Sequence, residues 1–223
     1  MRLFAALLPP PDVLDHVRSV VDSVEVEVEP ERPVVVGPPG RHRLGRKRPA
    51  TEEAEPPAPT GPMLDLIAPE ALHLPIAKFG NLALDDATRL ANTMDRDARG
   101  WATPRLRLAG GLALEPEGDY SVWVRLAGDV DALGTVRHGV SRAAQGLHFF
   151  VDRRVFRPEV QLGMINDRTT AEYLEQLLAA LDAFESAAWW QTTVSLLVPT
   201  DQGPGKPPFK TFRDIPLGPA VDH

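Results

Sequence analysis

The stretch LHLPIAKFG at residues 72–80 has the pattern of a buried strand that ends at a glycine. Because side chains alternate between the two faces of a strand, His73 and Pro75 are expected on the same face. Apolar residues at helical spacing follow and predict a helix over residues 85–98. A strand followed by a helix is therefore the first recognisable unit of the fold.

A second unit of the same kind lies later in the chain. The stretch FRPEVQLGMI at residues 156–165 has the pattern of a strand, and residues 170–185 carry leucines along one face of a helix. Thr169 and Glu172 form a capping-box pattern at the start of that helix. The two units repeat in pattern rather than in identity, which suggests two similar halves.

The remaining elements mix helices with strands that are joined by short turns. Together with the two units above, they predict an α+β fold with antiparallel sheets. The additional strands and helices are expected at residues 2–8, 12–24, 105–114, 120–126, 131–145, 149–151, 192–198 and 209–216.

One long stretch of the sequence is predicted to lack regular secondary structure because of its proline content. The sequence has 223 residues with 23 prolines, and the region between residues 25 and 62 is rich in proline and charge but poor in large apolar side chains. We therefore predict a single domain, residues 1–223, that is interrupted by an insertion at about 25–62. The basic cluster Arg41–Arg48 in this insertion either contacts a protein or a nucleic acid or is simply solvated.

Composition removes several classes of function. The chain has no cysteine, which excludes disulfides, thiolate metal sites and cysteine nucleophiles. Its net charge of −7 repels nucleic acid and anionic membranes, so any site for a polyanion has to be local. The six histidines lack metal-ligand spacing, phosphate-loop and dinucleotide motifs are missing, and no apolar run is long enough to span a bilayer. We expect a cytoplasmic monomer without a metal or cofactor.

Three stretches resemble one known family. The opening MRLFAALLPP and the stretches at 73–80 and 156–162 are similar, in that order, to the start and the two motifs of the two-histidine phosphoesterases. These are LigT-like proteins, known as bacterial 2′-5′ RNA ligases or RNA 2′,3′-cyclic phosphodiesterases. The family motifs are His-x-Thr-Leu-x-Phe-Leu-Gly and Phe-x-Pro-His-x-Thr-Leu. The last two predicted strands also resemble the closing hairpin of that family.

The resemblance implies a two-lobed, pseudo-symmetric fold whose antiparallel sheets carry helices on the outside and enclose a central cleft. In such enzymes one histidine deprotonates the attacking group and the other protonates the leaving oxygen. The two motif hydroxyls hold the phosphate oxygens. A pair of imidazoles can divide the acid and base roles because each titrates near neutral pH.

The sequence departs from the family motifs at three of the four positions that carry this chemistry. His73 is kept, whereas Pro75 and Gln161 replace the two hydroxyl residues and Glu159 replaces the second histidine. Pro75 has neither a hydroxyl nor an N–H to offer a phosphate, while Gln161 retains an amide donor. The expected catalytic residues are thus His73 and Glu159, and Pro75 and Gln161 occupy the ligand-binding positions.

Charged neighbours of the motifs leave two interpretations open. Lys78 and Arg157 either contact an anionic ligand or are ordinary surface residues. Glu159 either acts as an acid with His73 as the base, which requires a protonated carboxyl group, or forms an ion pair that removes the base.

The replaced residues determine the functional interpretation. Loss of one acid–base partner costs typically about 10²–10⁴-fold in rate. We therefore interpret the chain as a diverged family member that binds a nucleotide, an RNA end or a similar anionic ligand, with its phosphodiesterase activity lost or strongly reduced. Two alternatives stay open: an enzyme that uses His73 and Glu159 as an acid–base pair, and a protein-interaction module that acts through residues 30–62.

Overall fold

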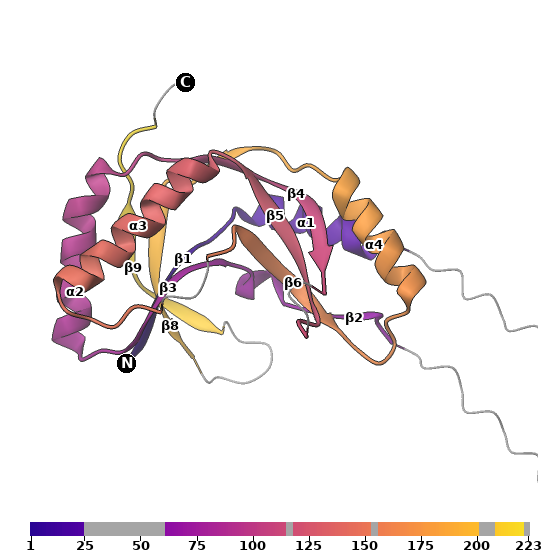
Figure 1. The fold of residues 1–223 in the computed structure, drawn as a ribbon, viewed down its shortest axis with the longest axis horizontal. Helices are drawn as coiled ribbons and strands as arrows, with labels where there is room; N and C mark the ends of the chain where they lie inside the picture. Colours follow the sequence, from indigo (N-terminus) through magenta and orange to yellow (C-terminus); the bar gives the residue numbers. More distant parts are fainter. Residues whose placement is uncertain (25–60, 115–117, 153–155, 201–207, 221–223) are drawn as a thin grey trace, which may run out of the picture.

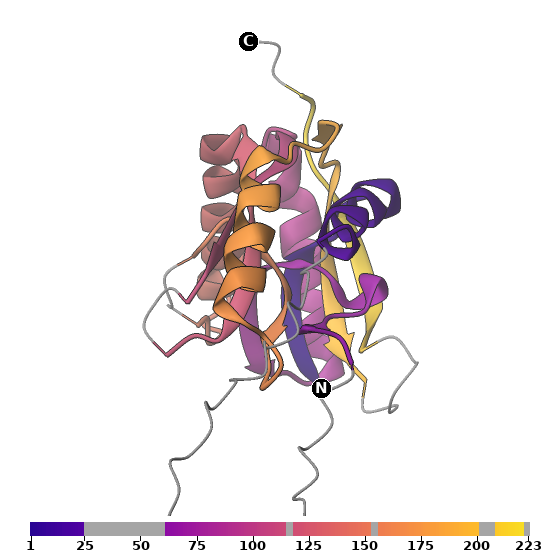
Figure 2. The ribbon, with the colours of Figure 1, turned by 90° about the vertical axis from the view of Figure 1, so that its right-hand side faces the viewer.

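The computed structural model describes residues 1–24, 61–114, 118–152, 156–200 and 208–220. All but the last two residues of the predicted insertion at 25–62, including Arg41–Arg48, lie outside the described residues. The described chain forms two antiparallel sheets with helices packed on them (Figures 1 and 2). The predicted α+β class is confirmed.

The first sheet joins strands from the two ends of the sequence, and its strand order is β3-β1-β8-β9. Its strands are β1 (Arg2–Leu7), β3 (Leu74–Asn81), β8 (Thr193–Pro199) and β9 (Phe209–Pro216). Because β3 is an edge strand, one side of its backbone needs no ladder partner, and the strand tolerates Pro75.

The second sheet is built from the middle of the chain, in the order β2-β6-β5-β4-β7. Its strands are β2 (Leu64–Leu66), β4 (Arg105–Ala113), β5 (Ser121–Gly128), β6 (Glu159–Ile165) and β7 (Trp189–Trp190). The sequence did not predict β2 and β7, which are only three and two residues long. The segment 149–151, expected as a strand, is irregular.

Two pairs of helices cover the sheets. The helices are α1 (Pro11–Asp22), α2 (Leu84–Asp97), α3 (Val130–Gly146) and α4 (Ala171–Ala183). The pair α2 and α3 packs against β9 and β3, whereas α4 packs on β4 and α1 packs on α4. The two pairs therefore lie at opposite ends of the molecule (Figure 1). Helix α1 directly follows β1 of the first sheet, but it packs against α4, the helix that covers the second sheet.

Helix starts differ slightly from the predicted caps. Helix α1 begins at Pro11, one residue before the predicted range of 12–24, because proline is pre-organised for the first helical position. The hydroxyl of Thr170, not of Thr169, accepts the Tyr173 N–H at 3.1 Å and caps α4. Thr169 instead donates to the Met63 carbonyl and ties α4 to the start of β2.

A bulge in β3 decides which of its side chains face away from the core. The pairing of β3 with β1 shifts at Ile76, so that this residue has no partner of its own. Ile76 and Ala77 are consequently both buried, while Pro75 and Lys78, three positions apart, are both exposed. Strict alternation would have exposed Ala77 and buried Lys78.

Candidate functional site

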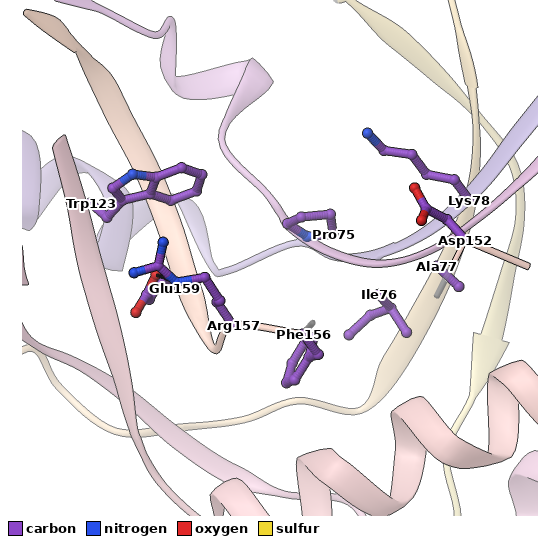
Figure 3. Close-up of a pocket in the computed structure, with 9 residues that line it drawn as sticks. All are labelled: Pro75, Ile76, Ala77, Lys78, Trp123, Asp152, Phe156, Arg157 and Glu159. Carbon is purple, nitrogen blue, oxygen red and sulfur yellow. Dashed lines mark ion pairs between the residues drawn. The ribbon is translucent and has the colours of Figure 1, made fainter. Parts of the chain in front are cut away.

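A cavity of about 270 Å³ lies between the two sheets, and we call it the inter-sheet pocket (Figure 3). The edge strand β3 forms one wall, and β5 with the start of β6 forms the other. The lining residues are Pro75, Ile76, Ala77, Lys78, Trp123, Asp152, Phe156, Arg157 and Glu159.

The charges of the pocket are separated by an apolar middle. Lys78 and Asp152 lie at one end, and Arg157 and Glu159 lie at the other end beside Trp123 (Figure 3). Two basic and two acidic side chains give the lining a formal charge of zero. The middle is formed by Pro75, Ile76 and Phe156 (Figure 3). The pocket is therefore neutral overall and lacks the strongly positive charge that is typical of a phosphate-binding pocket.

Glu159 is held by its neighbour on the same strand segment. Its side chain is 11% exposed, and its Oε2 lies 2.9 Å from Nε of Arg157. This ion pair requires the ionised carboxylate, which accepts hydrogen bonds but has no proton to donate. In this arrangement Glu159 does not perform the general-acid role of the histidine that the resemblance places at its position.

The two residues at the hydroxyl positions differ in what they offer. Pro75 lines the pocket but has no donor group. Gln161 uses its Nε2 amide to donate to Oγ of Ser121 at 2.9 Å, which holds it to the neighbouring strand. Neither residue reproduces a threonine hydroxyl facing a phosphate.

His73 lies immediately before β3, and its ring is packed among aromatic side chains. The ring centroids of Phe4 and Phe209 are 5.5 Å and 5.3 Å from that of His73. Its Nδ1 is 2.7 Å from the carbonyl oxygen of Ala71. Because a carbonyl only accepts, Nδ1 carries the proton, and Nε2 of the neutral ring holds the lone pair. His73 thus keeps the tautomer that a base needs.

The surroundings of His73 favour its neutral form. Burial lowers the pKa of His73 below its ordinary value of 6.5, and the positive charge of Lys78 lowers it further, while the hydrogen bond to Ala71 acts in the opposite direction. The net lowering of the pKa means that the imidazole is neutral at pH 7. Lys78 thus disfavours the protonated imidazole of His73.

We expect His73 to make folding stability depend on pH. Its lowered pKa means that the unfolded chain binds a proton more readily, so the folded state loses stability as pH falls below about 6.5. Urea unfolding of the wild type and of His73→Gln, which does not titrate, measures the contribution of this residue. The stability difference, wild type minus variant, is expected to be smaller at pH 5 than at pH 8. A difference that grows on acidification would contradict a lowered pKa.

The structure brings four of the six predicted site residues into one lining, namely Pro75, Lys78, Arg157 and Glu159. Of the described residues, His73 and Gln161 are not part of that lining.

Sequence reasoning missed Trp123 and Asp152 as pocket residues. Trp123 lies between Val122 and Val124, which are both buried in the core. Alternation along the strand therefore places the Trp123 side chain on the opposite face, and this was the signal that the sequence offered. Asp152 had none, because it reaches the pocket from an irregular segment, where its N–H donates to the Lys78 carbonyl at 3.1 Å.

Two features were not found in the described part of the chain, a cluster of metal-ligating side chains and a membrane-spanning helix. Within the described ranges, no three side chains of the metal-ligating types come together. None of the helices that the structure describes combines the length and hydropathy needed to cross a bilayer.

The two sheets, their outer helices and the pocket between them define the architecture as the LigT-like α+β fold. The crystal structure of E. coli LigT complexed with 3′-AMP matches with a TM-score of 0.62 and 14% identity over 97% of each chain. That of TT0787 of Thermus thermophilus gives 0.61 and 16% over 97% of this chain and 98% of its own. A crystal structure described as a phosphoesterase gives 0.59 and 14%, with the same two coverages.

The similarity to these three structures is a similarity of fold. No protein-family model and no curated protein sequence matches the chain. The similarity to LigT therefore lies in the arrangement of the sheets and helices, and the function has to be argued from the residues of the pocket.

Proposed function

We propose that the protein binds a nucleotide, an RNA end or a similar anionic ligand in the inter-sheet pocket and that it has lost most of the phosphodiesterase activity associated with this fold. The observation that carries the proposal is the ion pair of Glu159 with Arg157. It leaves an ionised carboxylate where the resemblance places a second histidine.

A phosphodiesterase of this type needs a proton donor for the leaving oxygen and hydrogen-bond donors for the phosphate. Losing an acid–base partner costs about 10²–10⁴-fold in rate, and losing a donor to a developing oxyanion costs about 10²–10³-fold. Glu159 supplies no proton in its paired form, and Pro75 supplies no donor. Binding requires less, since Lys78 still places a cation on the pocket wall, at the end opposite the ion pair of Arg157 with Glu159.

A protein of the same fold has been solved with several anionic ligands. E. coli LigT has been crystallised in complex with 3′-AMP, with NADP+, with phosphate and with ATP. All four ligands are anions that carry a phosphate, and three of them also carry a nucleobase. We extend this ligand class, and not an activity, to the present chain.

Calorimetric titration of the full chain with 3′-AMP and inorganic phosphate tests binding, and hydrolysis of 2′,3′-cyclic AMP tests activity. We expect saturable binding of 3′-AMP. Lys78→Met should weaken binding by about 10–100-fold, the value of a hydrogen bond to a charged group. Lys210→Met, an exposed lysine of β9 that is not part of the lining, is the matched control. Failure of 3′-AMP and phosphate to saturate, or ordinary rates of hydrolysis that His73→Ala abolishes, would refute the proposal.

A second candidate is an enzyme in which His73 remains the base. The hydrogen bond from Nδ1 to Ala71 and the lowered pKa of the imidazole favour it, because both leave Nε2 able to accept a proton at pH 7. In that case the acid has to be a protonated Glu159, released from Arg157. The activity would then rise as pH falls toward the titration of the carboxyl group, and Glu159→Gln would abolish it.

A further inference from the structure

We propose that the middle of the inter-sheet pocket binds a planar aromatic ring of the ligand between Trp123 and Pro75, with the anionic group of the ligand at Lys78. The inference rests on the proposed function and names the part of the ligand that the pocket recognises. The main determinant of affinity is then the ring rather than the phosphate.

The apolar surface of the pocket lies where a phosphate would otherwise be held. Pro75 occupies a hydroxyl position of the motif, and its ring is exposed toward the pocket. Trp123 projects from β5 toward Pro75 from the opposite wall, and Phe156 lies to one side of them, next to Ile76 (Figure 3). Two facing apolar walls accommodate a flat ring and offer nothing to a phosphoryl group.

Phe156 is in contact with a cation on the helix behind it. The guanidinium carbon of Arg137, on α3, lies 5.2 Å from the centre of the Phe156 ring, which is a cation–π contact. The aromatic wall is thereby anchored to the helix behind it. A rigid apolar wall favours ring binding, because little side-chain freedom is lost when the ligand enters.

The polar groups of the pocket agree with this assignment. The indole N–H of Trp123 is buried and has no hydrogen-bond partner among the described residues. Because this N–H is inaccessible to solvent, Trp123 offers a ligand the apolar face of its ring rather than a hydrogen-bond donor. Each cation of the lining has a carboxylate at its own end of the pocket, so a phosphate alone gains little net attraction.

The anionic group is assigned to the Lys78 end for two reasons. Arg157 already forms an ion pair with Glu159 at 2.9 Å, which satisfies part of its charge. Lys78 is exposed because of the bulge at Ile76, and its charge acts on the imidazole of His73. An anion at this end therefore lies near the one histidine that the motifs retain.

The test compares ligands with and without the ring. In wild-type protein, we expect 3′-AMP to bind at least about 10-fold more tightly than ribose 3-phosphate, since stacking of a base on an aromatic side chain supplies this much. Adenosine, which has the ring but no charge, is expected to bind measurably. This comparison needs no variant and is therefore independent of any effect on folding. Equal affinities for 3′-AMP and ribose 3-phosphate would overturn the inference.

Variants at Trp123 then locate the ring. Trp123→Leu is expected to weaken binding of 3′-AMP and adenosine by about 10-fold or more and to leave inorganic phosphate unchanged, while Trp123→Phe retains most of the affinity. Trp190→Leu is the matched control, because Trp190 is 43% exposed on β7 and is not part of the lining. Unchanged 3′-AMP affinity in Trp123→Leu, or equal losses for 3′-AMP and phosphate, would refute ring stacking at Trp123.

The outcomes separate the two proposals. If neither 3′-AMP nor phosphate saturates the wild-type protein, the proposed function fails and this inference fails with it. If 3′-AMP binds but neither removal of the ring nor Trp123→Leu weakens binding, the inference alone fails, and the pocket recognises the anion.

Discussion

The triple substitution Pro75→Thr, Glu159→His and Gln161→Thr is expected to raise the hydrolysis of 2′,3′-cyclic AMP by at least about 10⁴-fold over the wild type. A restored acid accounts for about 10²–10⁴-fold, and each restored phosphate donor accounts for about 10²–10³-fold. The gain is possible because His73 keeps Nδ1 on the Ala71 carbonyl and therefore has Nε2 available as the base. Initial rates at saturating substrate measure the change.

Two further variants serve as controls for this result. Adding His73→Ala to the triple variant should remove the gain, since the restored acid has no base to work with. The double variant Pro75→Thr and Gln161→Thr, which keeps Glu159 paired with Arg157, should fall short of the triple variant by about 10²–10⁴-fold, the factor that the acid supplies. A wild-type rate that already matches the triple variant would show that the replaced residues had cost nothing.

Gly139→Ala is expected to lower the free energy of unfolding by about 1–3 kcal/mol, the usual cost of overpacking a filled interior. Gly139 lies on α3, and a Cβ at this position would come within 2.3 Å of Cε2 and 2.5 Å of Cζ2 of Trp101. Trp101 is only 8% exposed, so its ring has little room to move away. Urea unfolding followed by circular dichroism measures the loss.

The same helix supplies the control. Gly134→Ala introduces the same methyl group earlier on α3, where a Cβ would meet nothing within 4 Å. Because alanine favours the helix over glycine by about 1 kcal/mol, this variant is expected to be slightly more stable than the wild type. A loss of stability in both variants would mean that α3 needs glycine for its backbone rather than for the contact with Trp101.

The sequence was sufficient for the parts of the fold that depend on local pattern. The strand and helix after residue 72 appear as β3 and α2, and those after residue 156 as β6 and α4. Each of these strands and helices buries one face, so the spacing of its apolar residues follows the period of a strand or a helix and identifies the element. The two-sheet arrangement followed from the resemblance rather than from the period.

The candidate site was less predictable because it depends on pairing between distant segments. The bulge at Ile76 exposes Lys78, and it exists only through the register of β3 with β1. Trp123 reaches the pocket because β5 and β6 pair with Trp123 opposite Gln161. The ion pair of Glu159 with Arg157 is local, yet the residue pattern offers no way to choose between this partner and His73.

The placement of β1 has a consequence for biosynthesis. This strand is synthesised before all the strands of the second sheet but pairs with β8, which is synthesised after them. The second sheet, built from the middle of the chain, can assemble while one side of β1 still has no neighbour. An apolar strand that waits in this state is open to pairing with other chains. We therefore expect chains that end before β8 to aggregate more readily than the full chain.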